Sequence, residues 1–125
     1  MSVRARGDAQ RIADILEHLE SIRGEMRVGK EAFRQDRRAQ KVVAYDLTIV
    51  GEAASKVRRA TQRANPGVPW SELVGYRNLL VHEYGDIDLE ETWVFVRDTL
   101  PKLERQLRRA RVAPSSDRDA SWLPG

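Results

Sequence analysis

The sequence predicts an all-α protein, an up-and-down antiparallel helical bundle of about five helices. Apolar residues recur at steps of three and four along several segments, as they do on helices that bury one face. The alternation of apolar and polar residues that is typical of strands is nearly absent, and short stretches with glycine or proline separate the periodic segments. A chain of 125 residues is long enough to bury one core without disulfides or metals.

The first helix is predicted from Asp8 to Met26, where six apolar residues fall on one face: Ile12, Ile15, Leu16, Leu19, Ile22 and Met26. We expect Asp8 to cap its N-terminus. His18 falls off the apolar face, so we expect it to be solvated. Gly29 breaks the pattern, and a short helix is predicted around residues 30–36.

A long helix is predicted next, from about Arg38 to Ala64, with apolar residues at steps of 4, 3, 4 and 3: Val43, Leu47, Val50, Ala54 and Val57. It should stop at residues 65–69, Asn-Pro-Gly-Val-Pro, because proline cannot continue a helix and these residues favour turns. A fourth helix should start near Trp70 and reach about His82, with a turn at residues 85–86. We expect Trp70, like Trp93 further on, to anchor the core.

The fifth helix is predicted from about Leu89 to Arg109, again with apolar residues at steps of three and four. Asp88 followed by Glu91 is typical of a capping box at its start. Pro101 lies inside this helix and should produce a kink or a local bend.

Composition limits the classes of function without choosing one. The net charge of +3 permits a nucleic-acid partner but cannot establish it. There is no cysteine, which fits a reducing cytoplasm, and no apolar run long enough to span a membrane. We expect a short arm at residues 1–7, the bundle domain at 8–111 and a flexible polar tail at 112–125.

The most informative stretch of the chain runs from Arg77 to Tyr84, Arg-Asn-Leu-Leu-Val-His-Glu-Tyr. It brings a permanent cation, a phenol and one of the two histidines within eight positions. These groups suit a phosphodiester: a neutral His82 could take the proton from a ribose 2′-hydroxyl, and Arg77 could stabilise the charge that develops at phosphorus. The alternative is structural, with Arg77 in an ordinary salt bridge and His82 closing a helix near its C-terminus.

The spacing of these residues poses a geometric difficulty. On a straight α-helix Arg77 and Tyr84 lie about 20° apart, but His82 lies about 140° from Arg77. The two could act together if the helix lines a groove, changes at its end, or faces a second copy of the chain.

Other polar residues are candidates with open alternatives. Glu52 is either solvated or a carboxylate that orients Arg77 or His82, and Asn78 could bind RNA or serve the structure. Two groups of arginines could attract RNA through its backbone charge or could simply be solvated helix faces: Arg58, Arg59 and Arg63, and Arg105, Arg108, Arg109 and Arg111. The acidic residues Asp86, Asp88, Glu90 and Glu91 fit a helix N-terminus better than a magnesium site. We expect no metal or cofactor.

The motif resembles a known family signature. Arg77, His82 and Tyr84 match the Arg-x4-His-x-Tyr motif of the HEPN-domain toxins, in particular the HepT-like ribonucleases, and Asn78 after the arginine matches the RN…HxY core of that family. Three other segments, 49–54, 66–70 and 93–103, resemble the IGEA, P-x-[IV]-P-W and W…LPxL segments of that family. The resemblance covers about residues 9–107. Tyr76, before the arginine, departs from the methionine that is frequent there.

This resemblance implies a homodimer in which two copies of the motif line one cleft. It implies the toxin of a type VII-like toxin–antitoxin system, a metal-independent ribonuclease that cleaves RNA internally or trims its ends. The partner would be a nucleotidyltransferase antitoxin of the MNT type, which can transfer AMP to the motif tyrosine, here Tyr84. AMP would add negative charge and bulk where an RNA phosphate should lie.

A second class of function remains open at this point. The chain could be a non-catalytic helical binding module that serves mainly as the partner and modification substrate of a nucleotidyltransferase. The motif would then be a recognition surface, with tight partner binding and no RNA cleavage.

Overall fold

The computed structural model describes residues 7–78 and 88–114. Within these residues every regular element is helical, which confirms the all-α prediction. The elements, in chain order, are α1 (Asp8–Met26), α2 (Lys30–Gln35), α3 (Arg37–Ser55), α4 (Arg59–Ala64), α5 (Trp70–Gly75), the 3-10 turn η1 (Tyr76–Asn78), α7 (Leu89–Val94), the π turn η2 (Phe95–Thr99) and α8 (Leu100–Arg108).

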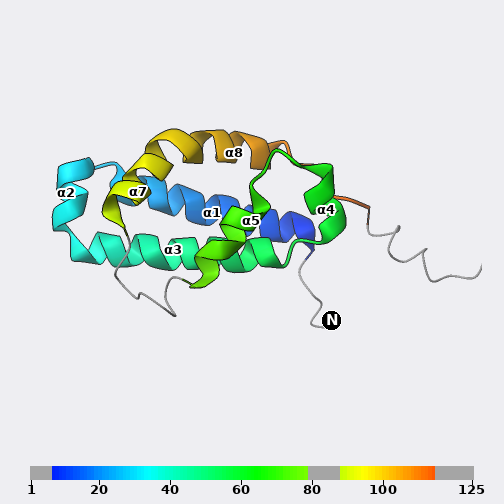
Figure 1. The fold of residues 1–125 in the computed structure, drawn as a ribbon, viewed down its shortest axis with the longest axis horizontal. Coiled ribbons are helices and arrows are strands. Elements are labelled where there is room, and N and C mark those ends of the chain that lie inside the picture. The colour runs from blue at the N-terminus through cyan, green and yellow to red at the C-terminus, as the bar shows by residue number, and fades with distance from the viewer. Residues whose placement is uncertain (1–6, 79–87, 115–125) are drawn as a thin grey trace, which may run out of the picture.

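Helix α1 forms the centre of the bundle. Figure 1 shows it between α3 and α8, antiparallel to both, with α2 closing one end and α4 the other. The predicted stripe of α1 is buried except for the half-buried Leu16, and it faces the predicted stripe of α3. The periodicity of the sequence therefore identified the two faces that form the core.

The prediction of one helix from Arg38 to Ala64 is wrong, because the helix is interrupted between α3 and α4. The last turn of α3 tightens, with the amide of Val57 donating to the carbonyl of Ala54 at 3.2 Å. Val57 stays in the core, and Arg58 adopts an extended backbone with φ −61° and ψ 151°. The amide of Arg58 donates to the carboxylate of Asp8 at 3.1 Å, so a distant residue supplies the acceptor that stabilises the break.

The predicted cap at Asp8 is also wrong. Gly7 occupies the N-cap position without a side-chain hydrogen bond, and Asp8 is the first residue of α1. The carboxylate of Asp8 turns to the start of α4 instead of capping its own helix.

The fifth predicted helix is present but irregular. It begins as predicted, with the carboxylate of Asp88 accepting from the amide of Glu91 at 3.0 Å. The π turn η2 then precedes α8, and the amide of Leu100 bonds to the carbonyl of Phe95, five residues back. Pro101 has no amide hydrogen, so the carbonyl of Arg97 lacks its usual helical donor. A kink or local bend was predicted at Pro101, and the structure has a π turn directly before α8, which carries Pro101 near its start.

Candidate functional site

The motif arginine lies where the segment α5–η1 crosses α3 (Figure 1). The crossing is tight at Gly51. A Cβ atom added there would overlap the backbone nitrogen of Arg77 and stand 2.9 Å from the carbonyl oxygen of Leu73. A residue with a side chain would have to push the two segments apart, so the glycine fixes the position of the Arg77 backbone on α3.

A second contact holds the same segment. Tyr76 is half-buried, and its ring packs edge-on against Phe95 of η2 with the centroids 5.7 Å apart. Burial raises the pKa of Tyr76 to about 12, with smaller contributions from the negative charges of Glu72 and Glu91. The segment that carries Arg77 is therefore packed against both Gly51 and Phe95.

The side chain of Arg77 is exposed, and Glu52 lies on the same region of the surface. The carboxylate of Glu52 binds the ammonium of Lys56 at 2.8 Å. A hydrogen bond from Lys56 is the main cause that lowers the pKa of Glu52, and the charge of Arg77 adds a smaller effect. Arg77 therefore lies near Glu52, but Glu52 takes Lys56 as its hydrogen-bonded partner.

The remaining motif residues fall partly outside the structure. Asn78 ends η1, whereas His82 and Tyr84 lie outside the described residues, as does the predicted turn at 85–86. The regular α-helix ends at Gly75, two residues before Arg77. The angle of about 140° calculated for a straight helix therefore does not apply from Arg77 onward.

A hollow beside this segment carries the opposite charge. It has a volume of about 510 Å³, and its lining includes Tyr76 and Phe95 together with three carboxylates: Glu72, Glu90 and Glu91. Glu90 is partly neutralised, because Lys30 and Arg34 contact it at 2.9 and 2.6 Å. A phosphate would be repelled from the two other carboxylates, so this hollow does not suit the RNA backbone.

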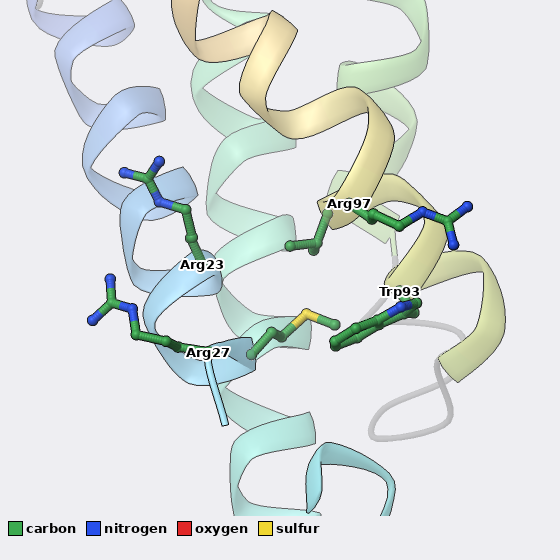
Figure 2. A pocket seen from close by; sticks show the side chains of 6 residues that line it. Arg23, Arg27, Trp93 and Arg97 are labelled. Carbon is green, nitrogen blue, oxygen red and sulfur yellow. The ribbon is translucent and has the colours of Figure 1, made fainter. Parts of the chain in front are cut away.

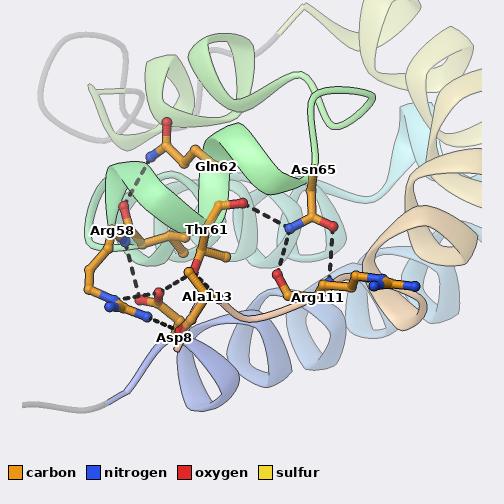
Figure 3. A network of polar contacts seen from close by, with 8 residues as sticks. Asp8, Arg58, Thr61, Gln62, Asn65, Arg111 and Ala113 are labelled. Carbon is orange, nitrogen blue, oxygen red and sulfur yellow. Dashed lines mark hydrogen bonds and ion pairs between the residues drawn. The ribbon is translucent and has the colours of Figure 1, made fainter. Parts of the chain in front are cut away.

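Arg58 has a structural role that the sequence did not reveal (Figure 3). Its guanidinium donates to Asp8 at 2.8 Å and to the carbonyl of Ala113 at 2.5 Å. Thr61 also donates to Asp8, at 2.5 Å. Burial alone would raise the pKa of Asp8, but the hydrogen bonds from Thr61 and Arg58 outweigh it and hold the pKa below its ordinary value. Of the first predicted arginine group, only Arg59 and Arg63 are exposed.

His18 corrects another expectation. It is not fully solvated: only 24% of its side chain is exposed, and its Nδ1 lies 2.8 Å from the carboxylate of the buried Asp46. Ser21 donates to the other oxygen of Asp46 at 2.6 Å. The cluster satisfies a carboxylate that α3 buries against α1, and a histidine off the apolar stripe was its only signal in the sequence.

Trp70 is buried as predicted, and its indole nitrogen donates to the carbonyl of Asn65 at 3.0 Å. Trp93 is only half-buried and lines an apolar pocket of about 190 Å³ between α1 and η2. Figure 2 shows that the guanidinium groups of Arg23, Arg27 and Arg97 point away from this pocket, so only their stems line it. The pocket thus lacks a charged group directed at a ligand.

Within the described residues, the chain is a small all-α protein with an exposed arginine, Arg77, whose backbone packs against Gly51. The model of the family described as "Ribonuclease HepT-like" matches residues 12–110. The chain belongs to the HepT-like ribonuclease family, as the motif resemblance predicted.

Individual relatives agree with this assignment. The chain is 30% identical over 100 residues to "Probable ribonuclease HepT" of Thermococcus cleftensis, covering 80% of this chain and 89% of the relative. It is 33% identical over 75 residues to "Putative RNase MJ1380" of Methanocaldococcus jannaschii, covering 60% and 69% of the two chains. A third relative, "Putative RNase TTE0752" of Caldanaerobacter subterraneus, is 28% identical over 90 residues, or 72% and 78% of the chains. No solved structure matches the chain.

Among the described residues, no helix is both long and apolar enough to cross a membrane.

Proposed function

We propose that this chain is a metal-independent ribonuclease and the toxin of a type VII-like toxin–antitoxin pair. One observation carries the proposal: the HepT-like family model matches residues 12–110, the range within which the motif residues lie. The position of Arg77 supports it, because two contacts hold its backbone while its side chain stays exposed. An exposed cation on a packed backbone suits an incoming phosphate.

The chemistry follows from the motif residues. A neutral His82 takes the proton from a ribose 2′-hydroxyl, and the resulting oxygen forms a bond to the adjacent phosphorus. The bond from phosphorus to the 5′-oxygen breaks, and that oxygen takes up a proton from water, while His82 later releases its proton to solvent. Arg77 stabilises the negative charge on the non-bridging oxygens. The products carry a 2′,3′-cyclic phosphate and a 5′-hydroxyl.

The supporting residues complete the proposed site. Asn78 follows Arg77 and could donate to the same RNA. Glu52 contributes a nearby negative charge that is shared with Lys56. In the homodimer that the family resemblance implies, the two copies of the motif would face one cleft, in the cytoplasm.

Control by an antitoxin forms the second part of the proposal. A nucleotidyltransferase of the MNT type would transfer AMP to Tyr84, and the added charge would repel RNA phosphate from Arg77. After co-expression with such an enzyme, mass spectrometry should find AMP on Tyr84 and none in a Tyr84→Phe variant. If Tyr84 carries no AMP, this part of the proposal is refuted, whereas the proposal of ribonuclease activity is unaffected.

The test of cleavage uses purified protein with EDTA and a labelled RNA. Loss of the general base in His82→Ala should slow cleavage by about 10²–10⁴-fold. Loss of the cation in Arg77→Ala should cost about 10²–10³-fold. His18→Gln and Arg38→Ala are the matched controls, since they change the same residue types elsewhere. Unchanged melting curves would show that the fold is intact.

Full cleavage by His82→Ala would exclude the assigned base. If the unmodified wild-type protein binds its partner tightly but never cleaves RNA, the alternative of a non-catalytic binding module would replace this proposal.

A further inference from the structure

The two arginine groups of the sequence meet at one end of the bundle. Helix α4 and the end of α8 lie some 45 residues apart in the chain, yet several hydrogen bonds join their segments. Asn65 donates to the carbonyl of Arg111 at 2.9 Å and accepts from its amide at 3.0 Å. Gln106 donates to the carbonyl of Gly67 at 2.9 Å, and Ala113 donates to Thr61 at 3.0 Å. Figure 3 shows this junction between α4 and the segment after α8.

Six exposed arginines lie on these two joined segments, whose exposed side we name the arginine end: Arg59, Arg63, Arg105, Arg108, Arg109 and Arg111. The two segments that carry it, residues 56–71 and 105–114, contain no aspartate or glutamate. Of the carboxylates beside them, Asp8 and Glu104 are buried and paired with Arg58 and Arg23, and the exposed Glu52 is paired with Lys56. The exposed Glu72 directly follows the first segment. No carboxylate within the two segments themselves therefore offsets the positive charge of this surface.

We infer that the arginine end is a docking surface for the phosphate backbone of RNA, separate from the motif that cleaves it. Guanidinium groups bind phosphate oxygens in a bidentate manner and keep their charge at any physiological pH. The exposed side chains of the arginine end include no aromatic ring on which a base could stack. Binding is therefore directed at the backbone and is largely independent of sequence.

The acidic hollow beside the motif segment bears on the path of bound RNA. Away from the arginine end, Glu90 pairs with both Lys30 and Arg34, and the hollow beside Tyr76 is lined by carboxylates. RNA bound at Arg77 would thus avoid the carboxylates of this hollow. It would extend over residues 56–71, which follow α3 and contain no acidic residue. The inference deepens the proposed function, and it rests on RNA being the substrate.

The test measures binding and not cleavage, so that the two proposals can fail separately. The probe is a fluorescent single-stranded oligonucleotide of 2′-O-methyl RNA, which has no 2′-hydroxyl to attack phosphorus. The full-length protein is titrated with it at several salt concentrations. The test variant is Arg63→Gln/Arg109→Gln, and the matched control is Arg37→Gln/Arg38→Gln, which removes the same charge from exposed positions at the opposite end.

Each phosphate contact with a single strand contributes about 0.7 to the slope of log K against log salt. Loss of two contacts should lower the slope by about 1.4 and weaken binding about 25-fold at 0.1 M salt. The control should keep the wild-type slope. Equal weakening of both variants would mean that only net charge matters and would overturn the inference, as would no weakening of the test variant.

Further outcomes distinguish this inference from the ribonuclease proposal and from binding to a membrane surface. If the wild-type protein cleaves RNA but the test variant binds the probe normally, the arginine end is refuted and the ribonuclease proposal stands. If the test variant loses binding but no preparation cleaves RNA, the docking surface stands without the enzyme. Binding to vesicles of anionic phospholipid, with no binding of the probe, would show a membrane surface instead and refute the RNA assignment.

Discussion

Replacement of Gly51 by alanine tests the contact that positions the motif arginine. The new methyl group would overlap the backbone nitrogen of Arg77 and lie 2.9 Å from the carbonyl oxygen of Leu73. Both neighbours are backbone atoms, so no side chain can rotate away to make room. The segment α5–η1 would have to move away from α3.

The magnitude is a balance of two effects. Overpacking of a well-packed contact costs about 1–3 kcal/mol. Alanine in place of glycine inside a helix returns up to about 1 kcal/mol. We therefore expect Gly51→Ala to lower the free energy of unfolding by about 1–2 kcal/mol, which corresponds to a fall in Tm of roughly 4 °C or more.

Gly24→Ala is the matched control, because Gly24 lies in α1 and a Cβ there would have no atom within 4 Å. It should gain stability by up to about 1 kcal/mol. Denaturant unfolding would measure both variants. A Gly51→Ala protein as stable as the Gly24→Ala protein would refute the close approach. Cleavage by folded Gly51→Ala should fall by up to about 10²-fold, since a shift of about 1 Å in a catalytic group can cost that much.

Two further predictions concern groups whose pKa differs from its ordinary value. Asp8→Asn should cost about 3 kcal/mol, because it leaves Arg58 half-buried without its anion. The pKa of Asp8 is lowered below 3.8, so the carboxylate stabilises the fold above about pH 4, and this stabilisation is lost as the pH falls through the lowered pKa. Acid unfolding curves of Asp8→Asn should lack this pH-dependent loss of stability. The pKa of Tyr76 is raised to about 12, so stability should fall between pH 10 and pH 12, and Tyr76→Phe should remove the fall. If Tyr76→Phe loses stability between pH 10 and pH 12 as the wild-type protein does, the raised pKa of Tyr76 is contradicted.

The sequence predicted those parts of the fold that depend on local pattern. Helix α1 has the predicted bounds because its apolar stripe is continuous from Ile12 to Met26. The stripe does not continue past Gly29, which has a φ of 105°. The start of α7 was predictable because a cap needs only Asp88 and the amide of Glu91. In each case the residues that decide the structure are neighbours in the chain.

The break after Ser55 could not be predicted in this way. No proline or glycine marks residues 56–58, and Val57 continues the apolar spacing of α3. The helix ends there because Asp8, fifty residues earlier, accepts from the amide and the guanidinium of Arg58. The same long-range contact explains why the predicted N-cap at Asp8 is wrong, since its carboxylate binds Arg58 and not the first turn of α1. The role of Gly51 also needed the structure, because the atoms it accommodates belong to a different helix.

The geometry around Glu52 bears on the role of the motif arginine. Glu52 follows Gly51, so the contact that fixes Arg77 also places a carboxylate near it. A direct salt bridge would hold the guanidinium and compete with a phosphate. Lys56 lies four residues after Glu52, the favourable order for a helical ion pair, and it takes the carboxylate at 2.8 Å. Lys56→Ala should therefore turn Glu52 toward Arg77 and weaken RNA binding beyond the loss of one charge. Glu52→Gln in that background should restore it.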